Sequence, residues 1–285
     1  MIRSTILPPE RATVVGVLNL TPDSFSDGGR FVREGAPPDV EAALAAARAL
    51  AAAGADWIDV GGESTRPGAE AVDEETEIAR TRPVVEALAK DLGVPVSIDT
   101  RNAAVAEAAL EAGARIVNDV SGLGHDPALA EVVARAGAGL VLGHLRGEPA
   151  TMQHHVHFGD VLAEVGDELA AAARTALAAG VPAERLAVDP GIGFGKRLEH
   201  NLVLLANAGR LRERLGLPLL VGPSRKAFLG ELTGDPVEAR DVATHAACAV
   251  ALFAGADGVR VHDVAGARRA AAVARALRDA RRTGA

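Results

Sequence analysis

The feature that most constrains the fold is an alternation of short apolar, β-branched runs with alanine-rich stretches of helical period, repeated eight times along 285 residues. Near-continuous hydrophobic strands separated by helices are typical of a parallel sheet covered by helices. Eight βα units in this length match a (β/α)8 barrel. We therefore expect an α/β fold in which residues 1–285 form a single (β/α)8 TIM barrel domain, since no Pro/Ser-rich linker divides the chain.

The expected strands cover residues 13–20, 57–62, 95–100, 115–121, 139–144, 186–191, 218–224 and 258–262. The helices expected between them cover residues 40–53, 73–92, 103–112, 127–136, 160–179, 202–215, 238–254 and 266–282. A doubly wound open sheet is the alternative architecture. It would normally carry GxGxxG after its first strand, whereas this chain has TPDSFSDGG there.

Charge and cysteine content narrow the function. The chain has 30 basic and 38 acidic residues, and its formal charge of −8 is the wrong sign for a general phosphate-backbone binder. We therefore expect no nucleic acid partner, and an anionic ligand must meet a local basic cluster. The single cysteine, Cys248, excludes an internal disulfide, and no signal peptide or membrane-spanning apolar run is present. These features predict a soluble cytoplasmic protein without a membrane partner.

Polar residues stand at the carboxyl end of every expected strand. They are Asn19, Asp59, Glu63, Asp99, Asn118, Asp119, His144, Asp189, Ser224, Arg225, Lys226, Arg260 and His262. Catalytic residues of a barrel project from this end. One such residue alone is equally consistent with simple exposure to solvent, but a set that spans eight strands predicts a functional site.

Closing the barrel makes its first and last strands neighbours, which brings Asn19 beside Arg260 and His262. The last two are two residues apart and so share a face. A cation and an imidazole beside an amide oxygen indicate a site for pyrophosphate and a metal. Mg²⁺ keeps most of its waters and takes further ligands from substrate phosphates, so the Asn19 oxygen alone can suffice. For His262, a hydrogen-bonded core histidine is the alternative.

A second polar cluster contains Asp99, Asn118 and Asp189. A planar heterocycle with adjacent N–H donors calls for a carboxylate that accepts parallel hydrogen bonds and an amide that donates and accepts. Lys226, one of only three lysines, is placed to meet a ring carbonyl or nitrogen on the opposite edge. The residues alone leave pterin, purine and sugar open, as well as a second metal or internal salt bridges.

Two long Gly/Pro/Ser-rich loops, residues 21–38 and 61–74, follow the first two strands. Long loops on the catalytic face are candidates for lids that order around an anionic intermediate. The polar or aromatic residues that they would bring are Asp23, Ser24, Phe25, Ser26, Asp27, Ser64, Thr65 and Arg66. A solvated surface loop is the alternative for each.

The chain resembles the dihydropteroate synthase family, the folate-pathway enzymes that sulfonamides inhibit. The similarity covers essentially the whole chain, through GVLNLTPDSFSDGG, DVGGESTRPGA, SIDT, NDVSG, RGEPATMQ, DPGIGFGK, GPSRKAFLG and GVRVHDV, in that order. The resemblance implies a (β/α)8 barrel, usually a homodimer, that joins 6-hydroxymethyl-7,8-dihydropterin pyrophosphate to p-aminobenzoate and releases pyrophosphate. These two small molecules would be its substrates and Mg²⁺ its cofactor.

The resemblance also implies roles for individual residues. Asp99, Asn118, Asp189 and Lys226 would hold the pterin, and Asn19, Arg260 and His262 the pyrophosphate and Mg²⁺. Thr65 and Arg66 would help to close the site, while Phe194, Ser224 and Arg225 would lie near p-aminobenzoate. The residues that would carry the chemistry are Asp99, Lys226, Arg260 and His262.

The chain departs from the family pattern at two places. Gly143 and Leu145 flank His144 where many members have a methionine, so we expect a looser pterin wall or one filled by Leu142 or Leu145. Ala227 replaces a serine that helps to hold the p-aminobenzoate carboxylate, which would then rest on backbone N–H groups or a helix N-terminus.

Two further signals do not indicate separate sites. The HHVH stretch (His154, His155 and His157) has no carboxylate at ligand spacing, and GIGFGK lacks the spacing of a P-loop, so it is interpreted as a loop over an aromatic substrate. The alternative functions are a pterin-dependent methyltransferase, which the NLTPDSFSDGG, STRPG and SRK elements disfavour, and a pterin-binding protein that has lost turnover. The latter would be expected to lack Asn19, Lys226, Arg260 or His262, all of which are present.

Overall fold

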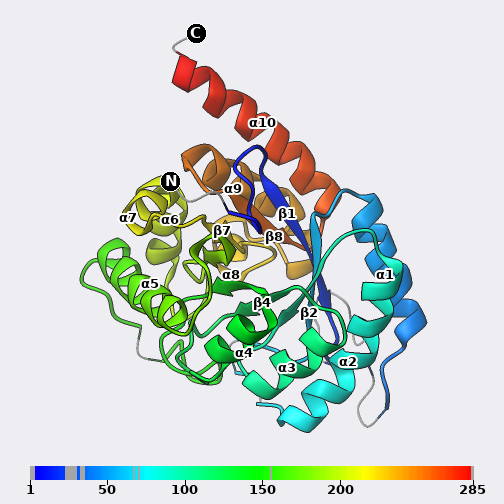
Figure 1. Cartoon of the computed structure of the whole chain (residues 1–285). Coiled ribbons are helices and arrows are strands. Elements are labelled where there is room, and N and C mark those ends of the chain that lie inside the picture. The colour runs from blue at the N-terminus through cyan, green and yellow to red at the C-terminus, as the bar shows by residue number, and fades with distance from the viewer. Residues whose placement is uncertain are drawn as a thin grey trace.

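A computed structural model describes residues 4–22, 31–32, 36–66, 68–69, 71–154 and 156–283. Within these ranges eight parallel strands lie inside a layer of helices (Figure 1). The strands are β1 (Thr13–Asn19), β2 (Trp57–Gly61), β3 (Val96–Asp99), β4 (Ile116–Asp119), β5 (Gly139–Leu142), β6 (Leu186–Val188), β7 (Leu220–Val221) and β8 (Gly258–Val261). All eight strands predicted from the sequence are present, and each ends one to three residues earlier than expected.

The sheet closes into a barrel. β1 pairs with both β2 and β8, so that Val15 lies opposite Trp57 on one side and Arg260 on the other. At the remaining seam, between β6 and β7, a parallel bridge joins Val188 to Leu219. Closure confirms the predicted (β/α)8 barrel and excludes the doubly wound open sheet.

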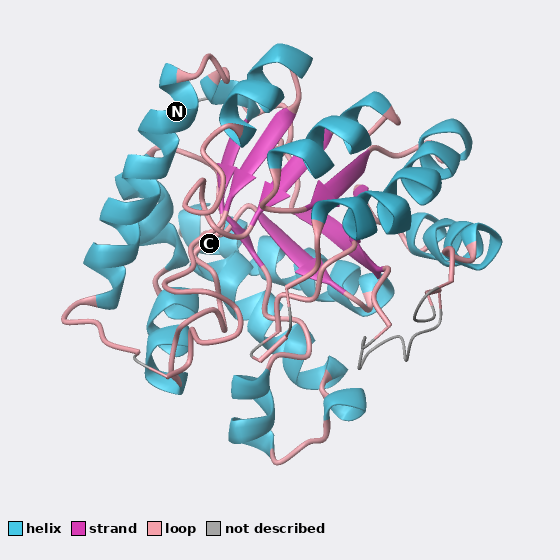
Figure 2. Ribbon diagram, turned by 90° about the horizontal axis from the view of Figure 1, so that it is seen from below, coloured by secondary structure: helices cyan, strands magenta, loops and turns pink. Residues whose placement is uncertain are grey.

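The helices surround the strands, as Figure 2 shows from below. They are α1 (Val40–Ala52), α2 (Glu74–Asp91), α3 (Ala103–Glu111), α4 (Leu129–Ala136), α5 (Val161–Ala178), α6 (Leu198–Ala206), α7 (Ala208–Leu215), α8 (Ala227–Thr233), α9 (Asp241–Ala254) and α10 (Val264–Thr283). Two short 3-10 turns, η1 (Ala183–Arg185) and η2 (Val237–Ala239), precede β6 and α9. None of the helices in these ranges is both long and apolar enough to cross a membrane.

The helix predictions needed two corrections. The helix expected at 202–215 is interrupted at Asn207, whose φ of −112° and ψ of 24° are not helical and whose side-chain amide donates to the Val203 carbonyl. A side chain that caps its own preceding turn competes with helix continuation. The seven-residue α8 was not expected, because it follows directly on a site segment and is too short to show a periodic pattern.

The barrel interior is layered. Side chains alternate between the two faces of a strand, so every second residue points inward. A lower apolar layer packs Val15, Trp57, Ile116, Val141, Ala187 and Leu220 around Leu7. Two residues further along their strands, Trp57, Ile116 and Ala187 are followed by Asp59, Asn118 and Asp189. The two-residue alternation that places the apolar layer inside the barrel therefore also places a layer of polar side chains inside it, nearer the carboxyl ends of the strands.

Candidate active site

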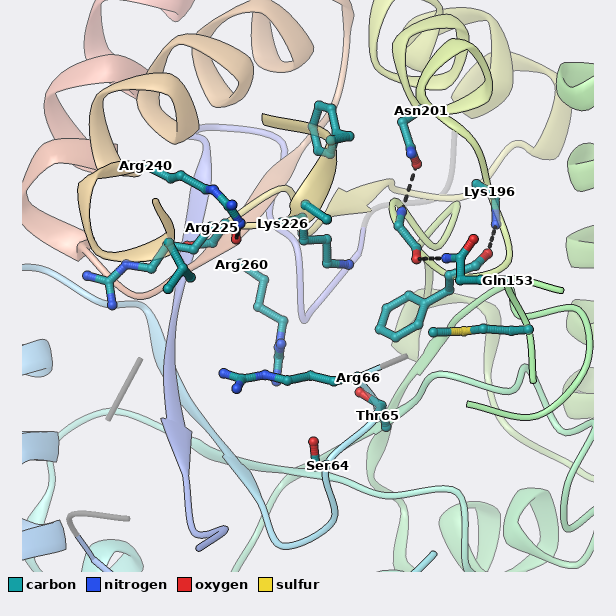
Figure 3. A pocket seen from close by; sticks show the side chains of 18 of the residues that line it. Ser64, Thr65, Arg66, Gln153, Lys196, Asn201, Arg225, Lys226, Arg240 and Arg260 are labelled. Carbon is teal, nitrogen blue, oxygen red and sulfur yellow. Dashed lines mark hydrogen bonds between the residues drawn. The ribbon is translucent and has the colours of Figure 1, made fainter. Parts of the chain in front are cut away.

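A cavity of about 850 Å³ opens at the carboxyl ends of the strands (Figure 3). Ten of the predicted site residues line it: Asn19, Thr65, Arg66, Asp99, Phe194, Ser224, Arg225, Lys226, Arg260 and His262. Asn118 and Asp189 lie just beneath this lining, Asn118 opposite Asp99 in the sheet register and Asp189 beside Gly222. The structure therefore brings the predicted site residues together at one end of the barrel.

Asp59 organises the floor of the cavity. Its side chain is 1% exposed and accepts hydrogen bonds from Arg260 Nε at 2.5 Å, Asn118 Nδ2 at 3.1 Å and Ser97 Oγ at 2.5 Å. From the sequence, Asp59 is predicted at a strand end, but no role is predicted for it. Its position two residues after the inward-facing Trp57 was the available signal. Asp59 fixes the orientation of both a cation and an amide that face the cavity.

Asp99 extends the same network toward the cavity. Arg260 Nη2 donates to Asp99 Oδ2 at 2.6 Å, so this guanidinium bridges two carboxylates. Burial raises the pKa of Asp99 to about 7, although Arg260 favours the ionised form. The carboxylates in turn hold the pKa of Arg260 above its usual range, against the effect of its burial. Asp99 is thus poised to accept hydrogen bonds near neutral pH.

Asp189 and Lys226 form the opposite wall. Asp189 Oδ1 accepts a hydrogen bond from the Gly191 N–H at 2.7 Å, and burial raises the pKa of Asp189 while Lys226 opposes the shift. Burial lowers the pKa of Lys226 to about 8. Lys226 Nζ donates to the Ile192 carbonyl and lies 4.0 Å from the centroid of the Phe194 ring. Lys226 therefore joins the carboxylate wall to the aromatic side of the cavity.

His262 and Ser224 form an electropositive corner. His262 Nδ1 lies 2.8 Å from Ser224 Oγ, and the His262 backbone N–H donates to the same oxygen at 3.1 Å. Because Ser224 Oγ already accepts that backbone bond, its hydroxyl is available to donate to Nδ1, which favours the tautomer with hydrogen on Nε2. Burial, followed by the charges of Arg225, Arg260 and Arg66, lowers the pKa of His262 to about 3. A neutral N–H donor surrounded by cations suits a bound anion.

Arg225 is held at this corner by its own partners. Its backbone has a φ of +56°, its N–H donates to Thr244 Oγ1, and its guanidinium makes two hydrogen bonds with Asp241 at 2.8 and 2.9 Å. The Arg225 carbonyl accepts a bond from Arg240 Nη1 at 3.2 Å. The SRK segment is therefore fixed by α9, and it directs Ser224 and Lys226 into the cavity.

Comparison with known proteins agrees with this geometry. A family model described as pterin binding enzyme matches residues 15–262. A dihydropteroate synthase from Synechocystis is 45% identical over 269 residues, which is 94% of this chain and 91% of the relative. The chain belongs to the dihydropteroate synthase family. Its relatives make it an enzyme of the transferase class and confirm the resemblance drawn from the sequence motifs.

Solved structures of dihydropteroate synthases have the same barrel. The Clostridium difficile enzyme in the presence of pteroic acid superposes with a TM-score of 0.85 at 37% identity, covering 94% of this chain and 97% of that one. The Xanthomonas albilineans enzyme with 4-aminobenzoic acid superposes with a TM-score of 0.85 at 44% identity, covering 95% of this chain and 94% of that one.

The second predicted lid, residues 61–74, is held by hydrogen bonds and ion pairs in its first half. Arg101, 5% exposed, donates to Glu63 at 3.1 and 3.2 Å and also pairs with Glu148. The Gly68 N–H donates to the Pro149 carbonyl at 3.3 Å. These contacts join the loop after β2 to the loop after β5 and present Thr65 and Arg66 to the cavity. In the first predicted lid, Asp23 to Asp27 lie outside the described residues.

Asn19 offers the oxygen expected of a magnesium ligand. Gly61 leaves space beside it: a Cβ at Gly61 would lie 3.7 Å from Asn19 Oδ1 and 3.9 Å from Asp99 Oδ2. No group of three or more His, Cys, Asp or Glu residues suited to a metal occurs within the described part of the chain. This donor set fits Mg²⁺, which takes few protein ligands when phosphate oxygens and waters complete its shell. It does not fit a metal held only by protein ligands.

The two departures from the family pattern have structural counterparts. Gly143 packs so closely that a Cβ there would lie 2.6 Å from Val120 Cα. Neither Leu142 nor Leu145 lines the cavity, whereas Met152 does and supplies a flexible apolar wall. Ala227 lines the cavity beside Lys226 without a side-chain hydroxyl. His154 and His157 belong to no metal-binding group among the described residues, while His155 lies outside them.

Proposed function

We propose that this chain condenses 6-hydroxymethyl-7,8-dihydropterin pyrophosphate with p-aminobenzoate, giving 7,8-dihydropteroate and pyrophosphate. One observation carries the proposal. The cavity has carboxylates with an amide on its floor, a lysine beside an aromatic ring on one wall, and a cation-rich corner around His262. These three surfaces suit a hydrogen-bonding heterocycle, an aromatic amine and a pyrophosphate respectively. Relatives solved with pteroic acid and with 4-aminobenzoic acid support the same assignment.

The floor would recognise the pterin. The pterin ring presents adjacent N–H donors, and carboxylates accept such pairs strongly when water is excluded. Asp99 and Asp189 supply these acceptors, and Asn118 supplies an amide whose orientation Asp59 fixes through a bond of 3.1 Å. Lys226, charged below its pKa of about 8, would donate to an acceptor on the opposite edge of the ring.

The corner would hold the leaving pyrophosphate. His262 would donate from Nε2, while burial and then the positive charges of Arg225, Arg260 and Arg66 lower its pKa. Asn19 would hold Mg²⁺ through its side-chain oxygen, and a bound Mg²⁺ neutralises charge that develops on the departing pyrophosphate. The protein groups at this corner stabilise that charge without reorganising during the reaction.

The chemistry requires no protein nucleophile. The bond between the pterin methylene carbon and the pyrophosphate oxygen breaks, and the oxygen keeps the electron pair. The aniline nitrogen forms a bond to that carbon and then loses a proton. Departure of pyrophosphate before attack fits a site that concentrates its cations at one corner. Positioning of both substrates and exclusion of water are then the main contributions of the barrel.

We also propose that the enzyme acts as a homodimer in the cytoplasm. The outer faces of α9 and α10 expose apolar side chains: Val242 is 79% exposed, Val250 54%, Val273 59% and Leu277 57%. These pairs are eight and four residues apart, which places each pair on one face of its helix. Light scattering after size exclusion should give the dimer mass, and Val250→Glu should shift it toward the monomer. A monomeric wild type would contradict the dimer.

The experiment that tests the activity is pyrophosphate release from the pterin pyrophosphate with Mg²⁺, with and without p-aminobenzoate. We expect release coupled to dihydropteroate formation. Lys226→Ala should reduce the coupled rate by about a hundredfold or more, because a buried charged donor is lost. No release despite measurable pterin binding would overturn the proposal and favour a pterin-binding protein without this turnover.

A further inference from the structure

The loop between β6 and α6 carries Phe194, and side chains bond to three of its consecutive carbonyls; Figure 3 marks the bonds of Gln153, Lys196 and Asn201. The Ile192 carbonyl accepts from Lys226, the Gly193 carbonyl from Gln153 Nε2 at 2.9 Å, and the Phe194 carbonyl from Lys196 Nζ at 3.0 Å. Asn201 Oδ1 also accepts from the Gly193 N–H at 2.7 Å. Loop carbonyls usually face water. Here they accept hydrogen bonds from protein side chains, so the backbone that carries Phe194 is held in place.

Lys196 is a buried cation among these supports. Its residue is 3% exposed, and its ammonium reaches three acceptors: the Phe194 carbonyl at 3.0 Å, His144 Nδ1 at 2.9 Å and the His144 carbonyl at 3.3 Å. An ammonium has three N–H donors, so these acceptors use its full capacity. A lysine is rarely buried without such compensation. The arrangement ties the backbone of the aromatic residue to the end of β5.

A second set of contacts orients His144. Because Nδ1 accepts from Lys196, the ring carries its hydrogen on Nε2, which donates to Glu168 Oε2 at 2.9 Å. Glu168 also accepts from Arg146 Nε at 3.0 Å. The bond from His144, with Arg146, lowers the pKa of Glu168 to about 2, and burial keeps His144 neutral by lowering its pKa. A charged carboxylate on α5 therefore anchors the histidine that holds the lysine.

Two glycines allow the loop to approach this anchor closely. Gly191 has a φ of +67°, and a Cβ there would collide with the His144 carbonyl. Gly195 has a φ of +57°, and a Cβ there would lie 3.0 Å from the Arg146 carbonyl. Glycine at both positions allows the loop to lie directly on the segment after β5. The position of the Phe194 ring is thus set from two sides.

We propose that Lys196, oriented by His144 and Glu168, is a positioning residue that fixes the Phe194 ring and so determines the affinity for the arylamine substrate. The inference rests on the proposed function, because it concerns the second substrate of that reaction. Lys196 bonds to the carbonyl of the aromatic residue and to His144, and it reaches the pterin floor only through its charge, which favours the ionised form of Asp189. Its loss should therefore affect the arylamine substrate much more than the pterin substrate.

The first test is steady-state kinetics of Lys196→Met with both substrates varied. We expect the KM for p-aminobenzoate to rise about tenfold or more, because a charge-assisted bond that holds the Phe194 backbone is lost. The KM for the pterin pyrophosphate should stay within about twofold. Lys90→Met, at an exposed lysine of α2, is the matched control and should leave both constants unchanged. An equal rise in both constants for Lys196→Met would overturn the proposal.

Glu168→Gln provides a second variant that keeps the buried lysine. Removing the negative charge of Glu168 weakens its bond to His144 and so acts on Lys196 only indirectly. We therefore expect a rise of about threefold in the p-aminobenzoate KM. This variant decides the question if Lys196→Met does not fold. A p-aminobenzoate KM equal to that of the wild type would contradict the role given to the Lys196, His144 and Glu168 chain.

A double-mutant cycle separates positioning from a general structural role. If Lys196 acts through the aromatic ring, Lys196→Met should change the p-aminobenzoate KM by less than about twofold in a Phe194→Ala background. A merely structural role would give the same tenfold rise in both backgrounds, and that result would overturn the proposal. Wild-type turnover is measured first in the same assay, so failure of the proposed function appears as no turnover in any variant.

Discussion

The floor and the rim of this active site are built differently. On the floor, Asp59, Asp99, Asn118 and Arg260 are inward-facing strand residues that bond to one another across the barrel interior, between strands that are not adjacent in the sheet. On the rim, Phe194 lies on a loop whose carbonyls accept bonds from Gln153, on the loop after β5, and from Lys196, on the same loop. Strand geometry fixes the floor wherever the barrel forms. The rim needs specific side-chain bonds, so substitutions there should affect one substrate at a time.

The largest expected effect is at the floor. Asp59→Asn removes the carboxylate shared by Arg260, Asn118 and Ser97, so we expect kcat/KM to fall by about a hundredfold to a thousandfold. Breaking a buried ion pair should also cost about 3 kcal/mol of unfolding free energy, measured in urea. Asp91→Asn, at an exposed carboxylate paired with Arg48, serves as the control. Near-normal kcat/KM in Asp59→Asn would refute the view that the floor is one network.

The pH profile tests two of the titrating groups that line the cavity, Asp99 and Lys226. Burial raises the pKa of Asp99 to about 7, so Asp99 is ionised above that pH, and lowers the pKa of Lys226 to about 8, so Lys226 is charged below it. We expect kcat/KM for the pterin substrate to peak between these values and to fall about tenfold per pH unit on either side. Asp99→Asn should remove the acidic limb. A profile with an unchanged acidic limb in that variant would assign the limb to the substrate.

A smaller effect is expected at the electropositive corner formed by His262 and Ser224. Ser224→Ala removes the hydroxyl 2.8 Å from His262 Nδ1 and so frees the imidazole to rotate and change tautomer. We expect kcat to fall about fivefold to tenfold with the p-aminobenzoate KM little changed. In His262→Gln, kcat should fall further than in Ser224→Ala. The comparison of the two variants decides whether Ser224 acts through the imidazole. A rise confined to the p-aminobenzoate KM would place Ser224 with the rim.

The smallest effect on activity is expected outside both regions. Glu77 on α2 is fully buried, accepts from Asn102 Nδ2 at 2.8 Å, and has its pKa raised to about 7, chiefly by burial. The folded state therefore holds a proton that the unfolded state releases at lower pH, and stability falls as pH rises from 4.5 to 7. Glu77→Gln should be more stable than wild type at pH 8, by on the order of 2–3 kcal/mol, with the difference vanishing near pH 4.

Chemical denaturation of Glu77→Gln and wild type at several pH values measures this difference, and kcat at each pH provides the control. An equal gain at every pH would show that packing, and not the proton, is responsible.

The sequence predicted the floor better than the rim. A period of two places Asp59, Asp99, Asn118 and Asp189 on inward faces, and the number of βα units predicts closure of the barrel. The pairing of Arg260 with Asp59 joins residues 201 positions apart, so no local pattern reveals it. Even so, strand periodicity alone brought most of the site to the correct end of the barrel.

The rim was harder to predict because its contacts depend on where loops meet. Lys196 and His144 are 52 positions apart, and GIGFGK was interpreted only as a loop over an aromatic substrate. The scarcity of lysine was the available signal, since one of three lysines stands in a glycine loop. Gln153 and Asn201 gave no signal, because polar residues are common beside loops. The break at Asn207 and the short α8 were missed for local reasons: the Asn207 side chain bonds its own preceding turn, and a seven-residue helix is too short to show a period.

The most direct test of the division between floor and rim is equilibrium binding of 6-hydroxymethylpterin, which lacks the leaving group, by calorimetry. We expect Asp99→Asn to weaken pterin binding by about tenfold or more, because a buried charged acceptor is lost, and Lys196→Met to leave it within about twofold of wild type. Comparable losses in both variants, or none in Asp99→Asn, would contradict the account.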